Sequence, residues 1–249
     1  MSGPTLSHNL SVYFPSADIP WHDMGDVWPC NCDGRILRTL DDGSVRSAVV
    51  RLSAGDGRDE TDPVVATVQG YVLSGELALG DVALTRGGFF AVPPGHALPA
   101  LSCSQDVEML LIFEVEGASA TDAEPVFLRS AFDIDPIVPV INGEPILGFE
   151  RRVLWEDPES GADTRLLKVP AGFEGKGTNW HPVHEEIFCL EGDIGPDDKR
   201  LLKPGSYLHN PAFGVHGYHE HSNGGATVLE WHDGRWAINF VLKKGDCHA

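Results

Sequence analysis

A short stretch of the sequence holds several side chains that could bind a metal ion. His181, His184, Glu185 and Glu186 lie within six positions, and His216 follows after an apolar run, a turn and a second short apolar run. Imidazole and carboxylate groups together suit a divalent first-row metal. Glycine and proline bound the apolar runs between them, which is typical of short strands and not of helices.

Strand geometry explains how these residues would meet. Side chains two positions apart on a strand point the same way, so Asn179 and His181 are expected to face one interior. Glu185 begins the next strand, and His216 enters from another side. His181, Glu185 and His216 are therefore candidate metal ligands; the alternative is that both histidines are ordinary interior side chains. His184 is either a further ligand or a residue of a tight turn.

The spacing resembles the two conserved motifs of the cupin superfamily, and the first segment is most similar to the anti-sigma-factor (ChrR-like) branch. The positions that match the motifs are His181, Glu185, Gly192, Gly205, Pro211 and His216. The resemblance implies that His181, Glu185 and His216 hold a metal ion, whereas Asn179 stands where the family has the first histidine of its pair. Four candidates therefore remain for the fourth metal ligand: Asn179, His184, His209 and a water molecule.

Two imidazoles and one carboxylate leave open positions on a metal, as in non-haem Fe(II) oxygenases. We expect one divalent ion per chain, with Fe(II) first and Mn, Ni or Zn as alternatives. Asn179 or His209 would orient the substrate, and His209 could also act as a general base. The candidate aromatic wall of this site consists of Phe188, Tyr207, Trp180 and Trp231, although core packing would explain these rings equally well.

An internal repeat connects the two halves of the chain. Gly75 precedes Gly192 by 117 residues, within the similar runs Tyr-Val-Leu-Ser-Gly and Phe-Cys-Leu-Glu-Gly. Gly87 precedes Gly205 by 118 residues, and a proline follows six positions after each. The chain therefore resembles a bicupin, which has two copies of one β-domain.

The repeat also predicts that the first copy has no metal site. The residues that correspond to Asn179, His181, Glu185 and His216 are Asp62, Val64, Val68 and Leu98. Valine and leucine cannot bind a metal ion. The nearby His96 is one place removed from ligand spacing and is expected in a loop.

The predicted fold class is all-β, with two tandem double-stranded β-helix (jelly-roll) domains. We place an extended arm at 1–35, the first domain at 36–117, a Pro-rich linker at 118–145 and the second domain at 146–249. The expected strands of the first half are Ser47–Leu52, Val64–Leu73, Phe89–Val92 and Val107–Val115. Phe127–Ile137 is the one weak helix candidate.

Charge and composition limit the classes of binding partner that we expect for this protein. The 249 residues carry a net charge of −19, which repels phosphate backbones and anionic lipid, so neither nucleic acid nor membrane is expected. No apolar run is long enough to span a membrane, and the first 16 residues lack the pattern of a leader. Five scattered cysteines favour a reducing cytoplasm. The resemblance also makes a homodimer plausible.

Three functions fit this sequence. The first is a metal-dependent oxygenase that acts on a small organic substrate, such as a diketone or a phenolic ketone. The second is a non-catalytic metal or ligand sensor, although no helical partner-binding segment accompanies the β-domains. The third is a sugar isomerase or epimerase, in which a proton moves without redox chemistry. Oxygen consumption would separate the first function from the third.

Overall fold

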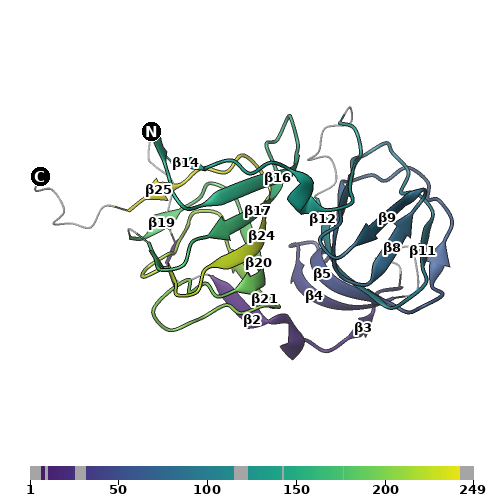
Figure 1. Ribbon diagram of the computed structural model, residues 1–249, viewed down its shortest axis with the longest axis horizontal. Helices are drawn as coiled ribbons and strands as arrows, with labels where there is room; N and C mark the ends of the chain where they lie inside the picture. Colours follow the sequence, from purple (N-terminus) through teal and green to yellow (C-terminus); the bar gives the residue numbers. More distant parts are fainter. Residues whose placement is uncertain are drawn as a thin grey trace, which may run out of the picture. The chain divides into compact units, whose positions relative to one another are not determined.

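The computed structural model describes residues 7–8, 11–25, 32–114, 123–141, 143–175 and 177–241. Its regular structure is almost entirely strand (Figure 1), which confirms the predicted all-β class. Helical structure within the described ranges is limited to short 3-10 turns, such as η1 (Ser16–Asp18) and η3 (Ala131–Asp133). No helix within these ranges is long and apolar enough to cross a membrane.

The chain forms two compact units. We call residues 16–135 and 154–160 the apolar unit, and residues 1–15, 136–153 and 161–249 the site unit. The division passes through the predicted N-terminal arm, because β2 (Val12–Pro15) pairs with a strand of the site unit while the residues after it belong to the apolar unit. The other domain boundaries stay predictions.

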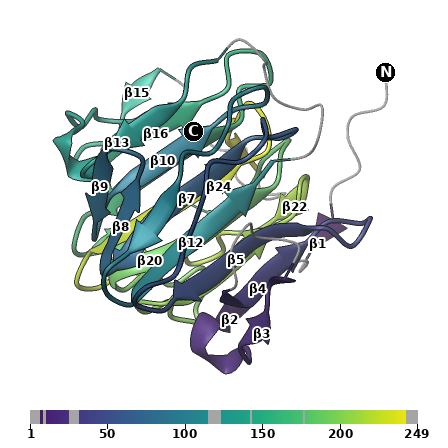
Figure 2. The same ribbon diagram turned by 90° about the vertical axis from the view of Figure 1, so that its right-hand side faces the viewer.

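The described residues of the apolar unit form two sheets. The larger has the order β13 (Val126–Leu128), β10 (Phe89–Val92), β7 (Val68–Ser74), β12 (Val107–Phe113), β5 (Val45–Leu52), β4 (Asp33–Thr39), β3 (His22–Asp23). Figure 2 shows β10, β7, β12 and β5 side by side. The smaller sheet has the order β6 (Gly57–Arg58), β11 (Leu101–Cys103), β8 (Glu76–Leu79), β9 (Val82–Thr85).

The main sheet of the site unit has the order β16 (Glu150–Glu156), β17 (Asp163–Val169), β24 (Ala226–His232), β20 (Glu185–Gly192), β21 (Ser206–Asn210), β2. Four strand pairs complete the described elements: β1 (Ser7–His8) with β22 (Gly214–Val215), β14 (Val140–Ile141) with β15 (Glu144–Pro145), β18 (Phe173–Glu174) with β23 (His221–Ser222), and β19 (Asn179–Trp180) with β25 (Asn239–Phe240).

The two main sheets repeat one topology. The run β10-β7-β12-β5 of the apolar unit has its counterpart in β21-β20-β24-β17 of the site unit. The register agrees as well. Asn210 pairs with Glu185 in the site unit, and the corresponding residues Val92 and Val68 pair with each other in the apolar unit. This agreement supports the internal repeat that was inferred from the sequence.

The positions of the apolar unit that correspond to the predicted metal ligands lie in or against a hydrophobic core. Val68 and Leu98, which correspond to Glu185 and His216, are 8% and 2% exposed and belong to one continuous hydrophobic core. Val64, which corresponds to His181, packs against the same core. Among the described residues of this unit, no group of histidine, cysteine and acidic side chains is arranged to hold a metal ion.

The weak helix prediction for Phe127–Ile137 is wrong. Phe127 lies in β13 and pairs with Phe90, and the rest of the segment contains only the single 3-10 turn η3. Ser130 caps that turn by accepting a hydrogen bond from the backbone of Phe132. Pairing of β13 with a neighbouring strand therefore overrides the local helix propensity of the segment.

Candidate metal centre

The four central strands of the site unit, β17, β24, β20 and β21, carry apolar inward side chains at one end and polar inward side chains at the other. Their inward positions at one end are apolar and form a core with Val169, Ile187, Cys189, Leu208, Ala226 and Val228. Their inward positions at the other end are polar and buried: Asp163, Arg165, Glu185, Asn210, Glu230 and His232. Because side chains alternate along a strand, this change gathers the polar groups at one end of the barrel.

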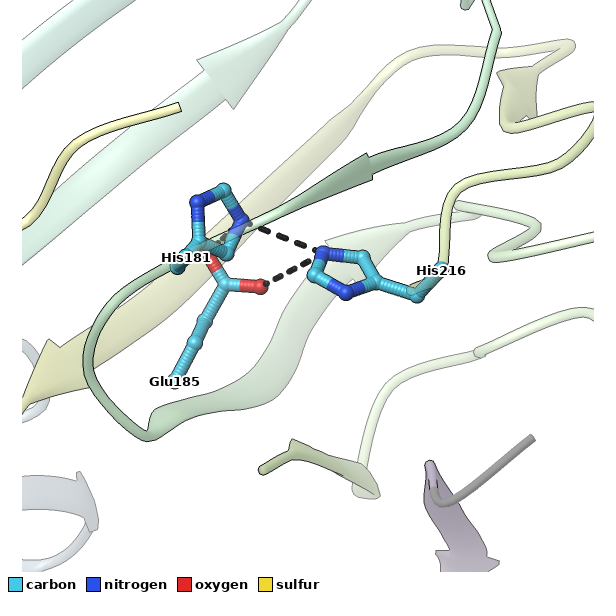
Figure 3. Close-up of side chains that lie close together, drawn as sticks. All are labelled: His181, Glu185 and His216. Carbon is cyan, nitrogen blue, oxygen red and sulfur yellow. Dashed lines mark hydrogen bonds and ion pairs between the residues drawn. The ribbon is translucent and has the colours of Figure 1, made fainter. Parts of the chain in front are cut away.

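Three side chains converge at this polar end, as Figure 3 shows. The Nε2 atoms of His181 and His216 lie 3.1 Å apart. The Glu185 carboxylate lies 3.5 Å from the first of these nitrogens and 3.6 Å from the second. The structure therefore brings together the three ligands that the sequence predicts, with their ligand atoms within 4.8 Å of one another.

The protonation of both imidazoles is set by backbone carbonyls. The Nδ1 atom of His181 donates to the carbonyl of Ala237 at 2.9 Å, and the Nδ1 atom of His216 donates to the carbonyl of Gly214 at 2.9 Å. A carbonyl can only accept, so in each neutral ring the Nε2 atom presents a lone pair. Burial lowers the pKa of His181 to about 4, against the opposing effect of Glu185, so this ring is neutral at pH 7.

Glu185 is held as an ionised carboxylate. Burial alone would raise its pKa, but nearby His181, His232 and His216 lower that pKa to well below its usual range. Two neutral donors fix its orientation: the Nδ2 atom of Asn210 at 2.8 Å from Oε2, and the indole Nε1 of Trp236 at 3.1 Å from Oε1. Partners of this kind orient metal ligands in known sites.

A second buried network lies beside Glu185. The Nδ1 atom of His232 donates to Asp163 at 2.7 Å, and its Nε2 atom lies 3.4 Å from Glu185. Burial and Arg165 lower the pKa of His232, but its bonds to the two carboxylates outweigh them and raise it. Arg165 lies between Asp163 at 3.4 Å and Glu230 at 3.2 Å. Arg165 is itself buried, at 5% exposed.

Glu185, Glu230 and His232 form a second group whose ligand atoms are close enough to hold an ion. Arg165 occupies the same space, since its guanidinium contacts Glu230 and its Nη2 atom lies 3.5 Å from the Nε2 atom of His232. The Arg165 guanidinium already neutralises the carboxylate charge that would otherwise attract a metal ion to this group. The group around His181 and His216 is therefore the better cation site.

The predicted residues His184 and His209 lie outside the cluster. The Nδ1 atom of His184 and the Nε2 atom of His209 form a hydrogen bond of 2.9 Å with each other. His209 pairs with Glu186 across β20 and β21, one position away from the Glu185–Asn210 pair, so its side chain is on the opposite face of the sheet. Neither histidine belongs to the group that could hold the ion.

The aromatic wall also differs from the expectation. Phe188, Tyr207 and Trp231 occupy strand positions that alternate away from Glu185 and His232. Tyr207 donates to Glu186 at 2.6 Å, so Glu186 is a buried carboxylate on that opposite face and is not solvated. The fourth candidate, Trp180, packs on Phe213.

Trp236 is the ring that borders the cluster. Its centroid lies 4.8 Å from that of His181, and the guanidinium of Arg165 lies 4.7 Å from the ring on which it stacks. Sequence reasoning missed Trp236, His232, Asp163 and Asn210. For His232 a signal existed, because it lies two positions after Glu230 in an apolar run that forms β24. The position of Trp236 in the segment after β24 gives no comparable pattern.

Comparisons with known proteins agree on the fold. No protein-family model and no curated protein sequence matches this chain. A Nostoc punctiforme protein (npun_f5605), provisionally described as a dioxygenase, has a structure that matches with TM-score 0.72 and 16% identity, over 95% of this chain and 85% of its own. Ylba from E. coli matches with TM-score 0.64 and 17% identity, over 92% and 93%.

A variant of Bacillus subtilis oxalate decarboxylase matches with TM-score 0.57 and 13% identity, over 96% of this chain and 81% of its own. A further structure of the Bacillus subtilis enzyme is described as having Mn(II) centres. At these identities the likeness shows the fold, which is an all-β jelly roll of the cupin type.

Proposed function

We propose that the site unit binds one divalent metal ion through His181, Glu185 and His216, and that the protein is a metal-dependent oxygenase for a small organic substrate. The observation that carries this proposal is the 3.1 Å approach of two Nε2 atoms whose rings both place their proton on Nδ1. Two lone pairs and an ionised carboxylate facing one another repel in the absence of a cation. A bound cation turns that repulsion into coordination.

The donor set fits such an ion. Two neutral imidazoles and one carboxylate are the ligands of the non-haem Fe(II) facial triad, which supplies open positions for substrate and dioxygen. Fe(II) is our first choice, with Mn, Ni and Zn as alternatives. Trp236 and Asn210 hold Glu185 in orientation, and the Trp236 ring covers one side of His181. His216 is the most exposed ligand, at 13%, so substrate would approach from its side.

The rest of the chain fits a bicupin in which one copy kept the site. The apolar core at Val68 and Leu98 supports a structural role for the first copy. The provisional dioxygenase description of the Nostoc punctiforme protein favours an oxygenase at the level of analogy. A homodimer and a cytoplasmic location stay predictions.

Oxygen consumption tests the activity. Metal-stripped protein would be loaded with Fe(II) without air and then mixed with air-saturated buffer and a panel of small diketones and phenolic ketones. We expect substrate-dependent oxygen uptake that His216→Ala abolishes. Turnover of a sugar without oxygen uptake would favour the isomerase, and metal binding without turnover of any compound would favour the sensor.

A further inference from the structure

Asn179 has a buried amide oxygen for which the fold provides no hydrogen bond. The residue is 5% exposed, and its Oδ1 atom has no hydrogen-bond partner among the described residues. Buried polar atoms in folded proteins nearly always have a partner, so an exception calls for a specific reason. A ligand that binds at this position would supply one.

The backbone places the side chains of Asn179 and His216 on the same face. Asn179 and His216 exchange both backbone hydrogen bonds, each 2.9 Å long, so they lie directly opposite each other. Opposite residues of an antiparallel pair project to the same face. His181 lies two positions after Asn179, just past the end of β19, and its imidazole meets that of His216 on this face. The amide thus shares one face with both histidine ligands.

The neighbouring loop leaves space for the amide. Gly217 has a φ of +78°, and a Cβ atom there would lie 2.7 Å from the Nδ2 atom of Asn179. Phe213 and His219, with φ of 60° and 64°, are the two non-glycine residues of the described chain in the left-handed region, and they flank His216 on either side. Such strained positions concentrate at binding sites.

We propose that the Oδ1 atom of Asn179 is the fourth protein ligand of the metal ion and shifts the preference of the site from Zn2+ toward Mn2+. This inference rests on the proposed function. The amide replaces a nitrogen donor with a neutral oxygen donor. Oxygen ligands suit Mn2+, whereas imidazole suits Zn2+, Cu2+ and Ni2+. The ratio of the Mn2+ and Zn2+ dissociation constants therefore depends on this residue.

Two substitutions and one control separate this role from a structural one. Asn179→Leu keeps the approximate shape and removes the donor, while Asn179→His restores a nitrogen donor. Asn239→Leu is the matched control, because Asn239 pairs with Trp180 and alternates to the opposite face. Dissociation constants for Mn2+ and Zn2+ would be measured by titration calorimetry on metal-stripped full-length protein.

We expect Asn179→Leu to weaken Mn2+ binding by about tenfold or more, a loss seen even for outer partners of metal ligands. Asn179→His should tighten Zn2+ more than Mn2+, and Asn239→Leu should change neither constant. The metal-free Asn179→Leu protein should melt no lower than the wild type, because the oxygen that it loses has no partner without the metal.

An unchanged Mn2+ constant in Asn179→Leu, with binding lost in His181→Ala, would overturn this inference and leave the proposed metal site standing. Absence of metal binding in the wild-type protein would overturn both. If Asn179→Leu does not fold, a crystal structure of the Mn2+-loaded wild type decides. Oδ1 in the coordination sphere supports the proposal, and a water molecule in its place contradicts it.

Discussion

The Nε2 atoms of His181 and His216 lie 3.1 Å apart, although neither ring has a proton to place between them in its neutral form. The Nδ1 protons are both used on backbone carbonyls, one in the segment after β24 and one in β22. When both rings are in this tautomer, the fold holds their two Nε2 lone pairs facing each other. This preorganisation is what a metal site requires of its protein.

Removing the orienting partner of Glu185 should weaken metal binding. Asn210→Leu deletes the 2.8 Å bond from the Nδ2 atom to the carboxylate and keeps the ligands themselves. We expect the dissociation constant for Mn2+ or Zn2+ to rise by about 10- to 100-fold. Ser11→Ala is the control, because the Ser11 hydroxyl donates to the Oδ1 atom of Asn210 and leaves the Nδ2 bond to Glu185 in place. Equal constants for Asn210→Leu and wild type would contradict the orienting role.

Trp236 should report metal binding optically. Its ring lies 4.8 Å from His181, so a paramagnetic ion such as Mn2+ at the site should quench its fluorescence. Trp236→Phe keeps an aromatic ring but loses the indole donor to Glu185, and we expect most of the metal-dependent quenching to disappear. Trp155→Phe provides the control in a buried tryptophan outside the cluster. A full quenching response in Trp236→Phe would exclude this ring as the neighbour of the ion.

The metal-free protein should lose stability on mild acidification. The pKa of His181 is about 4 in the folded chain, below its ordinary 6.5. Between these values the unfolded chain binds a proton that the folded chain does not, so the free energy of unfolding falls as pH falls from 6.5 to 4. The loss is roughly 3 kcal/mol for this residue. The lowered pKa of Glu185 adds a loss below pH 4.5.

Urea unfolding between pH 4 and 7.5 would measure this loss. His232 has the opposite sign, because its pKa is raised; its contribution is present below pH 6.5 and is lost as pH rises. His181→Gln removes the titrating group, so its free energy of unfolding should change less between pH 6.5 and 4. A pH dependence identical to that of wild type would show that His181 is not held neutral by burial.

The apolar unit should not tolerate a carboxylate at Val68, the position that corresponds to Glu185. Val68→Glu places a carboxylate in the hydrophobic core without a partner, which should cost about 3–5 kcal/mol of stability. Val68→Ile, the control, adds one methylene and no charge, so it should cost less stability than Val68→Glu. Urea unfolding compares the two. A stable Val68→Glu protein would mean that this core can solvate a carboxylate after all.

Local patterns in the sequence predicted much of the fold and the ligands. Apolar runs bounded by glycine and proline located strands such as Phe89–Val92, which the structure reproduces without change. The match of His181, Glu185 and His216 to the motifs of a known family grouped them, and the structure places each at or directly beside the end of a strand.

The remaining parts of the site depend on long-range pairing. Asn210 reaches Glu185 because β21 pairs with β20 in one register, and His232 reaches it because β24 pairs with β20 in another. A single sequence gives strand positions but not these registers. The same limit explains the error at Phe188 and Tyr207, where one step of alternation decides between the two faces of the sheet.

Metal analysis of the purified protein tests the central claim most directly. After loading with Fe2+, Mn2+ or Zn2+ and removal of excess, elemental analysis should find about one ion per chain in the wild type and almost none in His181→Ala, with circular dichroism of both proteins still typical of an all-β fold. A wild-type protein that retains no ion, or a His181→Ala protein that retains as much as the wild type, would contradict the account.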